Sequence, residues 1–111
     1  MTTHVNVEEL IGEMVERIVD RFHPLRIVLF GSQGRGGAGP DSDVDLLVVL
    51  PEAHDTYQAT RQILKALADI PWCKDIIVIS EQQVRTWGDV KNTALYSALR
   101  EGQSLYERTA R

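Results

Sequence analysis

The chain has 111 residues, of which 43% are hydrophobic and 25% are charged, and its formal net charge is −4. This length predicts one domain, residues 1–111, with no room for a substantial accessory domain. The negative net charge argues against direct nucleic-acid binding, which depends largely on positive charge at the protein surface. No apolar run approaches the roughly 20 residues that span a bilayer. Since the first residues lack a signal-peptide pattern and the single cysteine, Cys73, excludes an internal disulfide, we expect a cytoplasmic protein.

The first predicted element is an amphipathic helix over residues 6–22. Its apolar residues recur at steps of three and four, which places them on one face. Asn6 followed by Glu9 is typical of a capping box, and His23-Pro24 ends the helix because the residue before a proline is disfavoured in the α region. An apolar strand is expected next, over residues 25–30.

A turn at Gly31-Ser32 follows this strand, then a short helix over residues 32–36 and a glycine-rich loop over 36–40. A second strand is predicted over residues 43–50. Its uninterrupted apolar run after Asp45 is typical of a central strand that is covered on both faces.

The second half of the chain continues the alternation of helices and strands. Asp55 with Gln58 is expected to cap a helix that reaches about Ile70 and packs inward through Tyr57, Ile63, Leu64 and Leu67. A third strand is predicted over 74–79, and Ser80 with Gln83 caps a short helix after it. A last helix over 89–100, with Val90, Ala94, Leu95, Ala98 and Leu99 inward, is stopped by Gly102, and residues 103–107 form a final strand. The chain therefore has the pattern of an α/β (α+β) fold, with a mixed sheet of about four strands flanked by helices.

Asp43 and Asp45 are the first candidate site residues. Positions i and i+2 of a strand face the same way, so the two carboxylates converge beside the turn at Gly31. Their mutual repulsion favours a divalent cation between them, most simply Mg²⁺, and the N–H groups of the turn offer a site for phosphate. The plainer alternative is that both acids are solvated caps at the start of the strand.

Asp75 is the third carboxylate candidate, because it is the only acid in the predicted third strand and lies near the start of that strand. If that strand lies beside the strand of Asp45, Asp75 joins the other two acids; otherwise it is a charge that faces solvent at a strand end. Asp69, on the preceding helix, is the weaker alternative.

The order Gly31-Ser32-x-Gly34-Arg35-Gly36, a short loop and then Ser42-Asp43-x-Asp45-Leu46 resembles the signature of the DNA polymerase β-like nucleotidyltransferase superfamily, and the short chain resembles its minimal nucleotidyltransferase branch. The resemblance implies that Asp43, Asp45 and Asp75 are catalytic and bind the metal, two Mg²⁺ ions in this family. It also implies that Gly31, Ser32 and Arg35 bind the triphosphate. For Arg35, a surface position or a structural ion pair stays open.

What the resemblance implies for function is transfer of a nucleoside monophosphate, AMP from ATP, to a hydroxyl group. Members of this branch are often paired with a HEPN-domain toxin, and some of them adenylylate (AMPylate) a tyrosine of that partner. The resemblance therefore implies an antitoxin; a homo-oligomer and a hetero-oligomer both stay open. Two alternatives remain: a non-catalytic antitoxin on the same fold, and a transferase for a small molecule such as an aminoglycoside.

Other residue types invite weaker interpretations. Cys73 has no base partner in the sequence, so we expect a small core residue. The glycines match neither a dinucleotide fingerprint nor a Walker loop, and His4, His23 and His54 lack metal-ligand spacing. Trp72 and Trp87 are expected in the core or, if exposed, at a protein interface.

Overall fold

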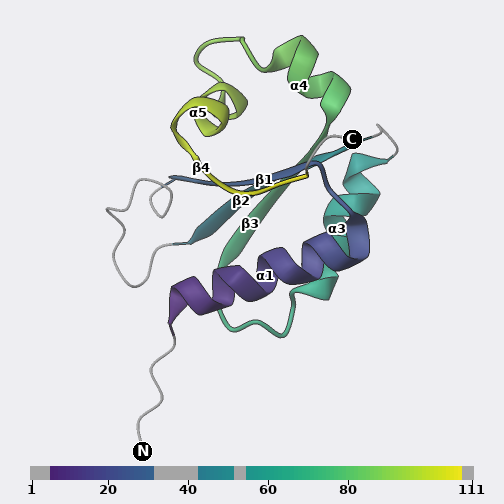
Figure 1. Ribbon diagram of the computed structural model, residues 1–111, viewed down its shortest axis with the longest axis vertical. Coiled ribbons are helices and arrows are strands. Elements are labelled where there is room, and N and C mark those ends of the chain that lie inside the picture. The colour runs from purple at the N-terminus through teal and green to yellow at the C-terminus, as the bar shows by residue number, and fades with distance from the viewer. Residues whose placement is uncertain (1–5, 32–42, 52–54, 109–111) are drawn as a thin grey trace, which may run out of the picture.

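The computed structural model describes residues 6–31, 43–51 and 55–108 (Figure 1). Its elements in chain order are α1 (Val7–Phe22), β1 (Arg26–Phe30), β2 (Val44–Leu50), α3 (Thr56–Ala66), β3 (Lys74–Ser80), α4 (Glu81–Trp87), α5 (Ala94–Glu101) and β4 (Gln103–Glu107). None of the helices in these ranges combines the length and the apolar character that crossing a bilayer requires. The expected short helix over residues 32–36 lies outside the described ranges.

The strands form one sheet in the order β3-β2-β1-β4. β1 is antiparallel to both β2 and β4, whereas β2 and β3 are parallel and are joined through the crossover helix α3. The central strand β2 is buried on both faces, as its continuous apolar run predicted. The mixed, four-stranded α+β sheet is thus confirmed.

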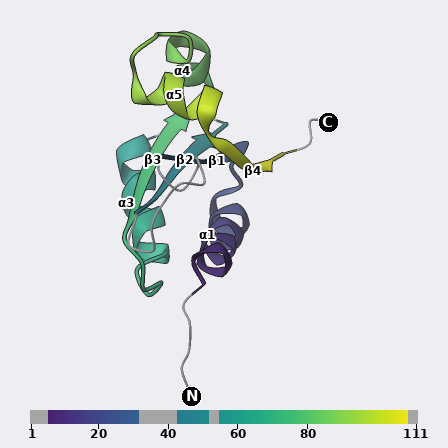
Figure 2. The same cartoon turned by 90° about the vertical axis from the view of Figure 1, so that its left-hand side faces the viewer.

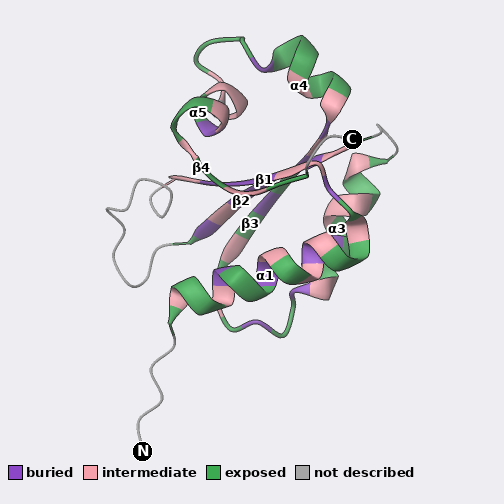
Figure 3. Cartoon of the chain, in the orientation of Figure 1, coloured by how far each residue is buried: buried purple, intermediate pink, exposed green. Residues whose placement is uncertain are grey.

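The helices cover the two faces of the sheet unequally. Figures 1 and 2 show α1 and α3 on one face, and α4 and α5 on the other; we call these the α1/α3 face and the α4/α5 face. The larger core lies on the α1/α3 face, where Met14, Ile18, Ile63 and Leu67 are fully buried against the strands. The smaller core, on the α4/α5 face, consists of Val28, Leu47, Val49 and Ala98. Figure 3 shows exposed and intermediate residues along α4 and α5; α4 has no buried residue, whereas α1 buries Ile11, Met14 and Ile18, so the α4/α5 face has the thinner cover.

Most of the predicted helix ends are confirmed. His23 ends α1 in the left-handed region, with φ of 51°. The side chains of Asp55 and Ser80 accept hydrogen bonds from Gln58 N and Gln83 N, and Gln83 completes the capping box at Ser80. At α1, Asn6 is the cap, but its side chain accepts from Glu8 N and the expected pairing with Glu9 is wrong.

Two helices are shorter than predicted. α3 ends at Ala66, because the chain turns at Leu67 and brings Ile70 into the core. Tyr57, predicted inward, is 72% exposed, and Leu64 is 38% exposed, since both share the outer face of α3. α5 begins at Ala94, not residue 89, because Asn92 is left-handed and Thr93 caps the helix through Tyr96 N; Val90, also predicted inward, is exposed.

Gly102, which ends α5, is packed too tightly for a side chain. A Cβ at this position would lie 2.4 Å from Val28 Cγ1 and 2.5 Å from the carbonyl oxygen of Ala98. We expect Gly102→Ala to lower the free energy of unfolding by about 1–3 kcal/mol, measured by urea denaturation. Gly12→Ala is the matched control, because a Cβ there meets nothing within 4 Å, and it should stabilise α1 by roughly 0.5–1 kcal/mol. Equal effects of the two changes would contradict this packing.

Candidate active site

Gly31, directly after β1, brings the backbone against a carboxylate. Phe30 pairs with Asp45 across the antiparallel β1–β2 ladder, and Gly31 follows with φ of 73°. A Cβ on Gly31 would lie 2.3 Å from Oδ2 of Asp45. Glycine is required here for its left-handed conformation and for the close approach. The predicted neighbourhood of the Gly31 turn and Asp45 is therefore present.

The three predicted carboxylates come from two neighbouring strands. Asp45 of β2 and Asp75 of β3 occupy matching positions of the parallel ladder, and Asp43 lies just ahead of β2, whose first residue is Val44 and not Asp43 as predicted. Alternation along the strands places Asp45 and Asp75 on the α4/α5 face, the one with the thinner cover. Asp43 and Asp75 are exposed and Asp45 is half-buried.

The electrostatics of Asp45 show that these acids interact. Burial raises the pKa of the Asp45 carboxyl, and the negative charges of Asp75 and Asp43 raise that pKa further. Each cause disfavours the ionised form, and a positive charge beside Asp45 would offset them. The sequence predicted that Asp75 joins the other acids if its strand lies beside the strand of Asp45. The structure places these two strands side by side.

The chemistry of these donors fits a hard divalent cation, which prefers carboxylate oxygens. In the part of the chain that the structure describes, however, no three His, Cys, Asp or Glu side chains lie close enough together to hold a metal ion. Mg²⁺ is commonly bound by one or two carboxylates, with water and substrate phosphates as its other ligands.

Two predicted nucleotide-binding residues, Ser32 and Arg35, lie outside the described residues, as do Ser42 and the glycine-rich loop. Their contacts with a triphosphate stay predictions.

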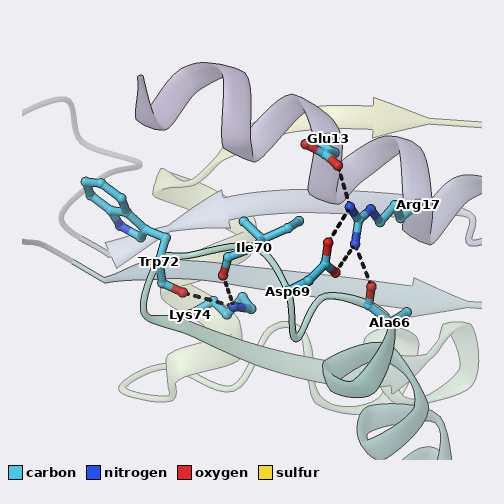
Figure 4. A network of polar contacts seen from close by, with 7 residues as sticks. All are labelled: Glu13, Arg17, Ala66, Asp69, Ile70, Trp72 and Lys74. Carbon is cyan, nitrogen blue, oxygen red and sulfur yellow. Dashed lines mark hydrogen bonds and ion pairs between the residues drawn. The ribbon is translucent and has the colours of Figure 1, made fainter. Parts of the chain in front are cut away.

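Asp69, the weaker acid candidate, belongs to an ion pair on the α1 side of the sheet (Figure 4). Its oxygens accept hydrogen bonds from the Arg17 guanidinium at 2.5 and 3.1 Å. These bonds hold the pKa of the Asp69 carboxyl below its usual range. Asp69 therefore has a structural partner and does not join Asp45.

The lowered pKa of Asp69 predicts a pH-dependent contribution to stability. Its ionised form stabilises the folded chain above the unfolded-state pKa of about 3.9, and this contribution is lost as the pH falls through the lower folded-state pKa. We expect Asp69→Asn to unfold at a lower urea concentration than wild type at pH 7, with the difference shrinking in acid. Asp20→Asn, which alters an exposed acid of α1, is the control. A difference that persists unchanged in strong acid would contradict the ion pair.

The single cysteine does not lie where it was predicted, and the two tryptophans differ from each other in burial. Cys73, expected in the core, is exposed, since it lies in the connection just before β3; its backbone carbonyl accepts a hydrogen bond from Val44 N at 3.0 Å. Trp72 is half-buried against the larger core, whereas Trp87 is 57% exposed at the end of α4. Sequence reasoning assigned no role to Arg17 or Lys74, whose side chains bind residues between α3 and Asp75. Arg17 and Asp69 are 52 residues apart in the chain, so no local sequence pattern indicated that they form a contact.

Several solved structures resemble the chain, among them the following three. A proposed nucleotidyltransferase from Sulfolobus solfataricus has a TM-score of 0.62 and 23% identity, and the alignment covers 90% of this chain and 79% of that one. A toxin-antitoxin structure with AMP-PNP has a TM-score of 0.57 and 19% identity, covering 88% of this chain and 73% of that one. The toxin-antitoxin MntA-HepT has a TM-score of 0.53 and 17% identity, covering 91% and 73%. At these identities the likeness establishes a shared fold.

The sequence comparisons identify the family. A segment of 31 residues, 28% of this chain, is 58% identical to the bifunctional uridylyltransferase/uridylyl-removing enzyme of Burkholderia vietnamiensis (strain G4 / LMG 22486), but it spans only 4% of that protein's length. The sequence model of the nucleotidyltransferase domain matches residues 11–100, which include Gly31 and all three carboxylates. The chain therefore belongs to the nucleotidyltransferase domain family, as its resemblance to nucleotidyltransferases predicted.

Proposed function

We propose that the chain is a Mg²⁺-dependent nucleotidyltransferase that moves AMP from ATP to a hydroxyl group. The acceptor in this proposal is a tyrosine of a HEPN-type toxin partner, so that the chain acts as a cytoplasmic antitoxin. The observation that carries the proposal is the backbone of Gly31 packed against the carboxylate of Asp45, which also lies opposite Asp75. The toxin-antitoxin structures that share the fold, one of them with AMP-PNP, support the nucleotide and the kind of partner.

The donor nucleotide is held on the β1 side of the acids. Backbone N–H groups at the turn after β1 donate to its phosphates, and Gly31 allows those phosphates to approach the backbone. In the proposal, the Ser32 hydroxyl donates to a phosphate oxygen, and the Arg35 guanidinium neutralises negative charge on the triphosphate.

Asp43, Asp45 and Asp75 would hold two Mg²⁺ ions. When bound, the ions neutralise phosphate charge and lower the pKa of the acceptor hydroxyl. Asp75 is exposed on the outer strand β3, where an acceptor can reach it, and we assign it the hydroxyl proton. The acceptor oxygen forms a bond to the α-phosphorus as the bond from that phosphorus to the bridging oxygen breaks, and pyrophosphate leaves.

The partner must present the acceptor, and the α4/α5 side has apolar surface for it. Trp87 is 57% exposed and Val90 is 41% exposed, both on or just after α4. Exposed large apolar side chains of this kind are common at protein interfaces. We place part of the partner contact at this end of α4.

A second candidate is a non-catalytic antitoxin on the same fold, which blocks its partner by contact. It is favoured by one observation: Trp87 and Val90 are exposed at the end of α4, where a partner can bind without nucleotidyl transfer. Binding of a metal with ATP separates the two candidates.

Thermal and urea unfolding with ligands tests the proposed site. ATP with Mg²⁺ at about 100 times the dissociation constant should raise the free energy of unfolding by about 2.7 kcal/mol. Removing the metal with EDTA should abolish most of this gain, and Asp45→Asn should show little of it. A gain of equal size with ATP and EDTA would contradict metal-dependent nucleotide binding at these acids.

A further inference from the structure

The connection between α3 and β3 determines where Asp75 lies. Asp75 is the second residue of β3, and β3 is the outer strand, paired with β2. The parallel ladder begins with Val44 opposite Lys74 and continues with Asp45 opposite Asp75. The path by which residues 67–73 enter β3 therefore decides how Asp75 is placed relative to Asp45.

The first part of this connection, directly after α3, is bound to α1 (Figure 4). The Arg17 guanidinium donates to the Ala66 carbonyl at 2.9 Å and to both oxygens of Asp69, and it also pairs with Glu13. A fixed, planar set of donors suits this arrangement, because it can bind a carboxylate in bidentate fashion. Arg17 thus fixes the end of α3, but it does so six or more residues before Asp75.

The last part of the connection, directly before β3, is held by Lys74, the residue that precedes Asp75. Lys74 Nζ donates to the carbonyl oxygens of Ile70 and Trp72, both at 2.9 Å, and Trp72 N donates to Ile70 O at 2.8 Å. The ammonium closes residues 70–74 into a compact turn and satisfies carbonyls of a half-buried segment. Because adjacent residues of a strand face opposite ways, Lys74 points away from the acids and acts on Asp75 through the backbone.

We propose that Lys74 is a positioning residue for nucleotidyl transfer: its two hydrogen bonds to the connection hold the start of β3 so that Asp75 stays opposite Asp45. This inference rests on the proposed function. Donor binding depends on the Gly31 side of the site, so loss of Lys74 should lower the transfer rate and not the affinity for ATP. A misplacement of about 1 Å can lower a rate about a hundredfold.

The test compares Lys74→Met with Lys65→Met, which removes an exposed lysine from the last turn of α3. Amide hydrogen exchange of residues 74–76 measures how firmly the start of β3 is held. Initial rates are measured with ATP labelled at the α-phosphate and, as acceptor, the protein that co-purifies with the chain from its native cell.

For Lys74→Met we expect exchange at residues 74–76 to become at least about tenfold faster and transfer to fall by about 10- to 100-fold, with the KM for ATP unchanged. Lys65→Met should match wild type in all three. Lys74→Arg should restore most of the rate, because a guanidinium can donate to two carbonyls. If Lys74→Met does not fold, Lys74→Gln, whose shorter and uncharged side chain weakens both hydrogen bonds, replaces it and should change exchange and transfer in the same direction.

Unchanged exchange at residues 74–76, a wild-type transfer rate, or a raised KM for ATP as the main effect would each overturn the positioning role. A wild-type chain that transfers no label refutes the proposed function itself and leaves Lys74 a residue of structural importance only. Failure of the inference and failure of the proposed function are thereby distinguished.

Discussion

Replacing Asp45 with asparagine should lower nucleotidyl transfer by roughly a thousandfold, because losing a charged ligand of the proposed metals removes several kcal/mol of transition-state stabilisation. Asp45 is the acid that contacts the Gly31 turn and faces Asp75, so it takes part in both halves of the proposed site. The measurement is the initial rate of transfer from labelled ATP at saturating Mg²⁺.

The stability of this variant separates a chemical role from a structural one. Burial and two negative neighbours raise the pKa of Asp45, so its ionised form is disfavoured in the folded chain and a neutral amide removes that penalty. Asp45→Asn should therefore unfold at the same urea concentration as wild type or at a higher one. Asp20→Asn is the matched control and should keep full activity. More than a tenth of wild-type activity in Asp45→Asn would contradict the assignment.

Gly31→Ala should destabilise the protein and abolish transfer together. The new Cβ would lie 2.3 Å from the Asp45 carboxylate, and alanine at φ of 73° is strained. Backbone strain and overpacking each cost roughly 1–2 kcal/mol, so we expect a loss of about 2 kcal/mol or more in the free energy of unfolding. Urea denaturation measures it.

Gly12→Ala gives the reference for this change, since it adds the same methyl group to an exposed helix without strain. Moving the Asp45 carboxylate away should also raise the KM for ATP in Gly31→Ala, through the phosphate-binding turn. If Gly31→Ala unfolds at the wild-type urea concentration, the close approach of Gly31 to Asp45 is wrong.

The fold could be predicted from local chemistry to a large extent. Caps such as Asp55 and Ser80 are set by hydrogen bonds within three residues, and the stop at His23-Pro24 follows from backbone sterics, so each was visible in the sequence. The inward faces were less predictable. Tyr57 and Leu64 fit a helical apolar stripe as well as Ile63 does, and only the position of the sheet decides which side is buried.

The site shows the same division between local and tertiary information. The i, i+2 spacing of Asp43 and Asp45 beside the Gly31 turn is local and gave the correct neighbourhood. The position of Asp75 depended on strand order, which the sequence left conditional. The ion pair of Arg17 with Asp69 and the bonds of Lys74 to its connection are products of tertiary packing and of the turn after α3, neither of which has a sequence signature.

The most direct test of the central claim is to incubate the chain with Mg²⁺, ATP labelled at the α-phosphate and the protein that co-purifies with it from its native cell. The proposal predicts label covalently attached to a tyrosine of that partner, no label from ATP labelled at the γ-phosphate, and none when Asp43 and Asp45 are both changed to Asn. A partner that binds stably but takes up no label from any nucleoside triphosphate would contradict the proposal and indicate an interaction module on a nucleotidyltransferase fold.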